Sequence, residues 1–180
     1  MGRVSIIAIL GNVGSGKSSV AKEVAHRLGG DYISAGDIAR AMTEKRSIQD
    51  FISTGEFAPE DEMRKQFEIA LRRCRKSVIV LDGMPRKPEQ VAYLEKLVGM
   101  VIYYVIDVDI ATIRCRLFKR GRLDDTPEVI HHRIDTGTKY LSGLMSVVGC
   151  GAVVVNGNRL INEIVDEICA NWEQNGGIKQ

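Results

Sequence analysis

Short runs of apolar, often β-branched residues recur along the chain and alternate with longer segments of helical periodicity. Runs of this length, bounded by turn residues, are typical of buried strands. Five of them predict strands at 4–10, 31–34, 78–82, 101–107 and 152–156. Because strands separated by helices form parallel sheets covered on both faces, the pattern predicts an α/β fold.

The segments between these strands carry the helical pattern. Helices are predicted near residues 17–28, 37–54, 60–76, 88–98, 109–120, 127–147 and 160–173. Thr126 is a good N-cap, and Pro127 suits the first position of a helix. Ile161, Ile164 and Ile168 repeat at helical spacing, so one face of the last helix should pack on the sheet.

Composition narrows the class of protein. A chain of 180 residues with 44% hydrophobic and 27% charged residues predicts one globular domain, 1–180. The net charge of +2 argues against a surface dedicated to nucleic acid. Four separated cysteines without a C-x-x-C pair indicate reduced thiols and a cytoplasmic location. We expect no membrane association, since no signal-peptide layout and no apolar run of about 20 residues is present.

A glycine-rich stretch, GNVGSGKSS, follows the first predicted strand at residues 11–19. It fits the phosphate-binding loop pattern G-x-x-x-x-G-K-[ST], in which glycines let backbone N–H groups wrap around phosphate oxygens. Lys17 would bridge the outer phosphates, and the Ser18 hydroxyl would ligate Mg²⁺. The residues expected to bind ATP here are Gly11, Gly14, Ser15, Gly16, Lys17, Ser18 and Ser19.

Further polar groups follow the other predicted strands, where open α/β folds bind ligands. The acid Asp82, at a strand end, can hold waters around Mg²⁺, and arginines can stabilise a transferring phosphoryl group. Arg116 and Arg120 lie one helical turn apart and therefore share a face. The groups are the stretches SAGDIAR at 34–40, DGMPR at 82–86 and RCRLFKRGR at 114–122.

In their order along the chain, these groups resemble the adenylate kinase family of nucleoside monophosphate kinases, from Val4 to about Ile168. The resemblance implies a three-layer P-loop nucleoside monophosphate kinase fold with a five-stranded parallel sheet. It implies reversible transfer of the γ-phosphoryl group of MgATP to AMP, with Mg²⁺ as cofactor, and we expect a monomer. A helical monophosphate-binding lobe, about 36–70, and a very short lid, about 119–126, would close over the two substrates.

The resemblance also implies a role for each matching residue. Arg40 and Arg86 hold the monophosphate's phosphate from opposite sides, and Gln90 reads the adenine of AMP. Arg116 packs against the ATP adenine, and the backbone at Gly157 contacts the same base. The monophosphate-binding residues are then Ser34, Ala35, Gly36, Arg40, Phe57, Ala58, Gly83, Arg86 and Gln90.

For the transfer step, the resemblance places Arg120, Arg122 and Arg133 around the moving phosphoryl group. Because both substrates are anions, the enzyme must offset their repulsion while it aligns them, so positioning and electrostatics carry the acceleration. The expected catalytic residues are Lys17, Arg86, Arg120, Arg122 and Arg133. The expected metal contacts are Ser18 and, through water, Asp82, with Asp37 as a further candidate.

Two positions point to different acceptors. Ala35 stands where AMP-specific members usually carry threonine, and SAGD is more typical of UMP/CMP kinases. Gln90 is the adenine-type residue, and we expect AMP because Gln90 can pair with the base edge while Ala35 only removes one hydroxyl. A UMP/CMP kinase is the alternative, followed by a small-metabolite kinase and a regulator that binds ATP without turnover.

The predicted lid departs from the family pattern in its length. Only Gly121 separates Arg120 from Arg122, which makes the lid unusually short.

Overall fold

A computed structural model of the chain describes residues 4–42, 60–120 and 126–175. At its centre lies a parallel sheet with the strand order β2-β3-β1-β4-β5. All five predicted strands are present, and the first extends one residue further than predicted, into the glycine loop. They are β1 (Ser5–Gly11), β2 (Asp31–Ser34), β3 (Val78–Asp82), β4 (Val101–Asp107) and β5 (Ala152–Asn156).

Helices connect the strands close to where the periodicity predicts them. They are α1 (Lys17–Arg27), α2 (Ala35–Ala41), α4 (Glu60–Arg73), α5 (Pro88–Val98), α6 (Ile110–Arg120), α7 (Pro127–Val148) and α8 (Ile161–Asn175), with a 3₁₀ turn at Gly149–Gly151. Within the described ranges, none of these helices is long and apolar enough to cross a membrane.

The caps explain where two helices begin. The Thr126 hydroxyl accepts a hydrogen bond from the backbone N–H of Val129 at 3.3 Å, which confirms the predicted start of α7. The predicted start of α2 at residue 37 is wrong by two residues. The Ser34 hydroxyl accepts a hydrogen bond from the backbone N–H of Asp37 at 3.1 Å, so α2 begins directly after β2. The predicted continuation of this helix to 54 lies outside the described residues beyond Met42.

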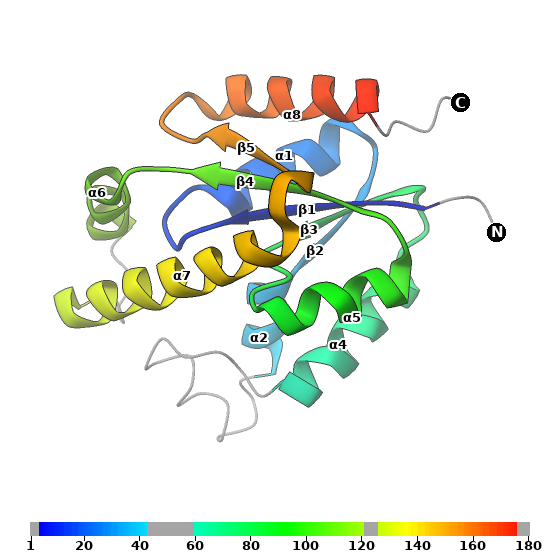
Figure 1. Cartoon of the computed structure of the whole chain (residues 1–180), viewed down its shortest axis with the longest axis horizontal. Helices are drawn as coiled ribbons and strands as arrows, with labels where there is room; N and C mark the ends of the chain where they lie inside the picture. Colours follow the sequence, from blue (N-terminus) through cyan, green and yellow to red (C-terminus); the bar gives the residue numbers. More distant parts are fainter. Residues whose placement is uncertain (1–3, 43–59, 121–125, 176–180) are drawn as a thin grey trace.

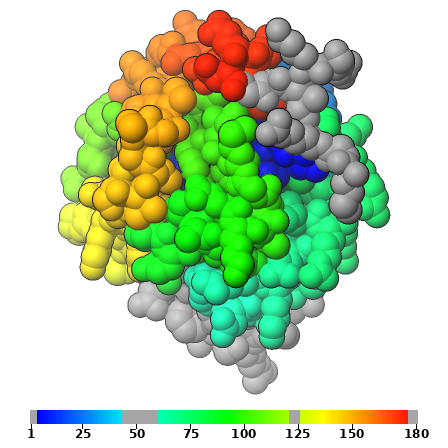
Figure 2. Space-filling model, turned by 45° about the vertical axis from the view of Figure 1, so that its right-hand side comes forward, coloured from blue at the N-terminus to red at the C-terminus, as the bar shows by residue number. Residues whose placement is uncertain are grey.

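Alternating side chains of β1 enter two separate cores. Ile7 and Ile9 pack on one face, with α1 and α8, whereas Ile6, Ala8 and Leu10 pack on the other. That second face is covered by α4, α5 and the C-terminal half of α7 (Figure 1). In the space-filling view these elements form one continuous surface (Figure 2). Both faces of the sheet are therefore buried, and the predicted three-layer α/β fold is confirmed.

The parallel strands end at one edge of the sheet, and that edge carries the polar stretches. Asp82, the last residue of β3, is aligned with Ile9 of β1 and with Ser34 of β2. On the other side, Gly11 is aligned with Ile106 of β4. The glycine loop, the start of α2 and the segment after β3 therefore meet at this edge, as parallel topology requires.

Candidate active site

The backbone of the glycine loop has a conformation that only glycine adopts readily. Gly11, Gly14 and Gly16 have φ angles of 151°, 77° and 88°. A Cβ atom on Gly14 would lie 2.9 Å from Leu117 Cγ, so α6 packs directly against the loop. Gly16 is the N-cap of α1 and has no side chain to cap it, and Gly16, Lys17 and Ser18 line the cavity described next, so the positive end of this helix faces that cavity.

A cavity of about 510 Å³ opens between the loop, the ends of β2 and β3, and α6. Most of the predicted site residues line it, although they come from distant parts of the sequence. The predicted residues brought together there are Gly14, Gly16, Lys17, Ser18, Ser19, Ser34, Gly36, Asp37, Arg40, Asp82, Arg86, Arg116 and Arg120.

Other predicted site residues are not among those that line this cavity. Ser15 is buried within the loop, and Ala35 is buried in the core on the α4–α5 side of the sheet. Arg133 is half-buried on α7. Phe57, Ala58 and Arg122 lie outside the described residues, so their roles stay predictions. The remaining ones, Gly11, Gly83, Gln90 and Gly157, are located below by their contacts.

Lys17 is directed across the loop. Its Nζ donates a hydrogen bond to the backbone carbonyl oxygen of Asn12 at 3.1 Å. Burial lowers the pKa of Lys17 to about 8; the charge of Asp82 opposes this shift, whereas the charges of Arg86 and Arg120 add to it. Burial and the two arginines therefore outweigh Asp82 and disfavour the positive charge of Lys17, and a bound anion would offset them.

We expect ATP binding to take up a proton at alkaline pH. Bound phosphates favour the charged lysine, so the Kd for ATP should rise by up to about tenfold for each pH unit above the Lys17 pKa of about 8. Isothermal titration calorimetry at pH 7 to 9.5, in two buffers with different ionisation enthalpies, measures both the Kd and the proton uptake. A Lys17→Arg variant stays protonated throughout and should show a flat profile. An equal slope in both proteins would contradict the assignment to Lys17.

Asp82 is held in a way that leaves one carboxylate oxygen available. Its side chain is buried, at 4% exposure, and Oδ2 accepts a hydrogen bond from the Tyr32 hydroxyl at 2.8 Å. Burial, together with the Asp82 charge, raises the pKa of Tyr32, which therefore stays a donor. Oδ1 is buried and has no hydrogen-bond partner in the described part of the chain. With the exposed Ser18 in the first turn of α1, this oxygen fits a hydrated Mg²⁺ ion.

Two guanidinium groups face the cavity from the acceptor side. The Arg86 Nε donates a hydrogen bond to the Gly83 carbonyl oxygen at 2.9 Å, and Arg40 forms an ion pair with Asp37. Burial lowers the pKa of Arg86, the Asp82 charge opposes this, and the Arg40 charge adds to it. Arg40 and Arg86 are neighbouring cations that repel each other. A phosphate dianion bound between them would reduce this repulsion.

Gln90 is buried beside Arg86, with its amide oriented by two contacts. Its Oε1 accepts a hydrogen bond from the backbone N–H of Arg86 at 2.6 Å. Its Nε2 donates to both carboxylate oxygens of Glu60, at 3.0 Å each. The first turn of α4 thus holds the side chain predicted to read the acceptor base, close to the arginine predicted to hold the acceptor phosphate.

Arg116 ties the glycine loop to the end of the sheet. One terminal nitrogen donates to the Ser15 carbonyl oxygen at 3.0 Å, and the other donates to the Gly157 carbonyl oxygen at 3.1 Å. A Cβ atom on Gly157 would lie 2.6 Å from Ile106 Cγ2, so a larger residue would push this turn away. The Arg116 guanidinium group therefore links the loop predicted to bind the ATP phosphates with the turn predicted to contact the ATP base.

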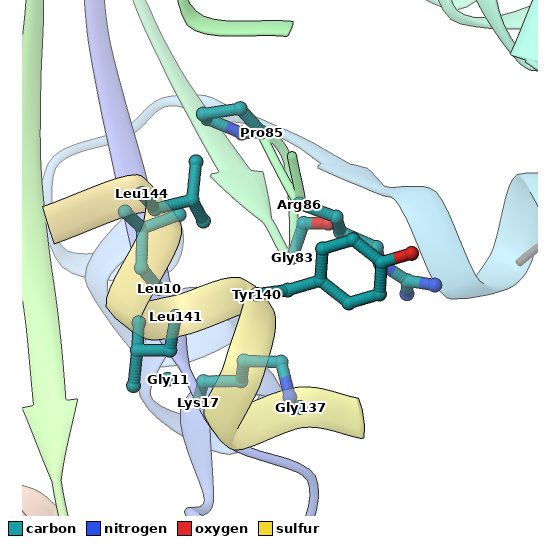
Figure 3. A pocket seen from close by; sticks show the side chains of 10 residues that line it. All are labelled: Leu10, Gly11, Lys17, Gly83, Pro85, Arg86, Gly137, Tyr140, Leu141 and Leu144. Carbon is teal, nitrogen blue, oxygen red and sulfur yellow. The ribbon is translucent and has the colours of Figure 1, made fainter. Parts of the chain in front are cut away.

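A smaller cavity of about 100 Å³ lies between α7 and the loop. In Figure 3 the Tyr140 ring lies beside the Arg86 side chain and Lys17 extends towards Gly137, whereas Leu10, Leu141 and Leu144 lie together on the other side. Its lining residues are Leu10, Gly11, Lys17, Gly83, Pro85, Arg86, Gly137, Tyr140, Leu141 and Leu144. Residues of α7 therefore line the same cavity as Lys17 and Arg86, which are predicted to contact the phosphates.

Three side chains that shape the site were not predicted. Asn12 occupies an unrestricted position of the loop pattern, so the motif carries no signal for it. Tyr32 is two residues before Ser34 on β2, and the two-residue period of a strand places both on the same side, which was an available signal. Glu60 reads simply as an acid in the first turn of a helix. Its contact with Gln90 spans thirty residues and arises only from tertiary packing.

A phosphate loop, a strand-end acid and clustered arginines at the edge of a parallel sheet define a P-loop phosphotransferase. Residues 10–131 match the family model described as an AAA domain. The chain is 33% identical to adenylate kinase 1 of Nostoc sp., over 91% of this chain and 96% of that protein. It is 32% identical to an adenylate kinase of Campylobacter concisus, over 91% and 95%. An adenylate kinase isoenzyme 1 of Gallus gallus is 28% identical, over 92% of both chains.

The chain therefore belongs to the adenylate kinase family. The sequence-based prediction of this family is confirmed, and with it the predicted enzyme class, an ATP-dependent nucleoside monophosphate kinase.

Proposed function

We propose that the protein transfers the γ-phosphoryl group of MgATP to AMP, reversibly, and so forms two molecules of ADP. One observation carries this proposal: a single cavity is lined by Lys17 of the loop, by Arg40 and Arg86, and by the strand-end acid Asp82. The loop with Lys17 serves the donor, and Arg40 with Arg86 serves the acceptor. Two anionic substrates placed head to head require this distribution of charge.

On the donor side, the loop N–H groups and the α1 dipole would bind the β- and γ-phosphates. Lys17, desolvated and near Arg86 and Arg120, would stabilise the negative charge on the phosphoryl group during its transfer. Arg116, fixed between Ser15 and Gly157, would pack against the ATP base. These interactions hold the donor phosphates pointing towards the acceptor.

Mg²⁺, when bound with ATP, would neutralise charge on the β- and γ-oxygens. Ser18 would contact it, and the free Oδ1 of Asp82 would accept hydrogen bonds from its waters. The Tyr32 hydroxyl fixes the other carboxylate oxygen, so the direction of Oδ1 is set before any ligand arrives.

On the acceptor side, Arg40 and Arg86 would bind the phosphate of AMP, with Gly83 in contact with Arg86. Guanidinium groups suit this task because each offers two parallel donors and stays protonated. Arg120, Arg122 and Arg133 would surround the phosphoryl group in transit. We propose that the lobe at about 36–70 and the short lid at about 119–126, of which 43–59 and 121–125 lie outside the described residues, would close over the substrates and keep water from accepting the phosphoryl group.

Two features of the site support AMP over a pyrimidine nucleotide in this proposal. Ala35 is buried in the core and does not line the cavity, although its neighbours Ser34 and Gly36 do, so we infer that its missing hydroxyl has little bearing on the base. Gln90 is held by Glu60 and by the backbone of Arg86, and its amide is the group that pairs with adenine in this proposal. The relatives named above are also adenylate kinases.

A coupled assay with MgATP and a panel of AMP, dAMP, CMP, UMP, GMP and shikimate tests the proposal. We expect kcat/KM to be highest for AMP. Faster turnover of CMP or UMP would assign a pyrimidine kinase, and turnover of shikimate would assign a metabolite kinase. ATP binding by calorimetry without turnover of any acceptor would indicate a regulator and contradict the proposal.

A further inference from the structure

Asn12 is a buried polar residue, 6% exposed, and its side chain joins the glycine loop to α7. Its Nδ2 donates to the Ile134 carbonyl oxygen at 3.2 Å and to the Thr138 hydroxyl at 2.8 Å. Its Oδ1 accepts from the backbone N–H of Val13 at 2.7 Å. A buried amide that bonds two segments more than 120 residues apart specifies how those segments are placed.

Gly137 has no side chain and so leaves a gap on the surface of α7 into which the Asn12 amide fits. We call this gap the notch at Gly137. A Cβ atom there would collide with Asn12 Oδ1 and lie 3.1 Å from Asn12 Cγ. Glycine inside a helix destabilises it by about 0.5–1 kcal/mol relative to alanine, so helix stability alone would favour alanine at this position. Close approach of Asn12 supplies the physical reason for the glycine.

The notch lies next to the predicted catalytic groups. Arg133 precedes Gly137 by four residues, one helical turn, so both lie on the same side of α7. On the loop side, the carbonyl oxygen of Asn12 accepts the hydrogen bond from Lys17 Nζ. One loop residue therefore contacts Lys17 through its backbone and the turn that carries Arg133 through its side chain.

We propose that Asn12 is a positioning residue: its amide, seated in the notch at Gly137, sets the position of Arg133 relative to the phosphate-binding loop. This inference rests on the proposed function, in which Arg133 acts on the phosphoryl group in transit. The loop and the first turns of α7 then behave as one rigid unit. Displacement of α7 by a fraction of its width would move the arginine away from the charge it stabilises.

A double-mutant cycle between Asn12→Ala and Gly137→Ala tests the fit. In the wild-type background, Gly137→Ala should lower kcat by about tenfold or more and leave the KM for AMP within about twofold, since Arg40, Arg86 and Gln90, the predicted acceptor contacts, are not on α7. In the Asn12→Ala background the same substitution has room for its methyl group and should change kcat by less than about twofold. Equal effects in both backgrounds, or an unchanged kcat in the Gly137→Ala single variant, would overturn the proposal.

A second cycle asks whether Asn12 acts through Arg133, and it remains informative if Gly137→Ala folds poorly. Asn12→Ala should lower kcat about threefold to tenfold in the wild-type background and have almost no effect in an Arg133→Ala background. A residue that merely stabilises the fold would lower kcat by the same factor in both.

Ser142→Ala, on an exposed position of α7, is the control and should leave kcat unchanged. Thermal unfolding of every variant separates loss of fold from loss of positioning. Absence of AMP turnover in the wild-type protein would contradict the proposed function. Wild-type turnover with purely additive variants would contradict only the inference about Asn12.

Discussion

Replacement of Lys17 by alanine is expected to lower kcat by about 10²- to 10³-fold, the loss seen when one preorganised donor to a transition state is removed. The structure supplies the reason. The Lys17 ammonium is partly desolvated beside Asp82 and two arginines, where an interaction with the transferring group is stronger than in water. Steady-state kinetics with MgATP and AMP measure the effect, and calorimetry shows how much of it is lost ATP binding.

The same substitution should spare the fold. The folded-state pKa of Lys17, about 8, lies below its ordinary value of 10.5, so the charged lysine disfavours the folded state at neutral pH. This penalty diminishes as pH rises from 8 towards 10.5. At pH 7 we therefore expect the free energy of unfolding of Lys17→Ala to match or exceed that of the wild type. Lys96→Ala, on the exposed side of α5, is the control and should keep full activity. A Lys17→Ala enzyme with wild-type kcat would refute the role of this residue.

Arg86→Ala is expected to raise the KM for AMP by about tenfold to a hundredfold, the loss typical of a hydrogen bond to a charged group. The KM for ATP should change much less, because the loop, Lys17 and Arg116 are left in place. Arg86→Lys keeps the charge and loses the planar pair of donors, so its KM for AMP should lie between those of the wild type and Arg86→Ala. Initial rates at varied AMP and saturating MgATP measure the split.

An exposed arginine gives the matched control for this experiment. Arg72 on α4 has a side chain 79% exposed and an ion pair with Glu68 one turn away. Arg72→Ala removes one positive charge from the same protein without touching the cavity, so both KM values should stay at wild-type levels. If Arg86→Ala left the KM for AMP unchanged, the acceptor site would have to lie elsewhere.

The strands were predictable because a buried parallel strand has a strong local signature. Ile6 to Leu10 and Val78 to Leu81 are runs that leave no alternative to burial on both faces, and each forms a strand. The start of α2 was less predictable. Ser34 could end a strand, cap a helix or do both, and the hydrogen bond to Asp37 shows that it does both. Local sequence cannot decide between these outcomes, since each satisfies the same backbone groups.

The donor half of the site was readable for a similar reason. The loop from Gly11 to Ser19 is contiguous in the sequence. Its glycines are best explained by the close approach of backbone N–H groups to phosphate oxygens. The acceptor half was readable only through resemblance. Arg40, Arg86 and Gln90 are far apart along the chain, and no spacing rule brings them together before the strands are paired.

The sequence by itself determined the strands, the order of helices and the phosphate-binding loop, since each depends on residues that are neighbours along the chain. Only the tertiary structure decided which groups orient the site: Tyr32 on Asp82, Glu60 on Gln90, and Asn12 on the turn at Ile134. Each of these is a contact between segments distant in the sequence, and its partner is selected by how helices pack against the sheet. Such pairs leave no periodicity or motif, because buried polar groups can be satisfied by whichever partner the fold brings within hydrogen-bond distance.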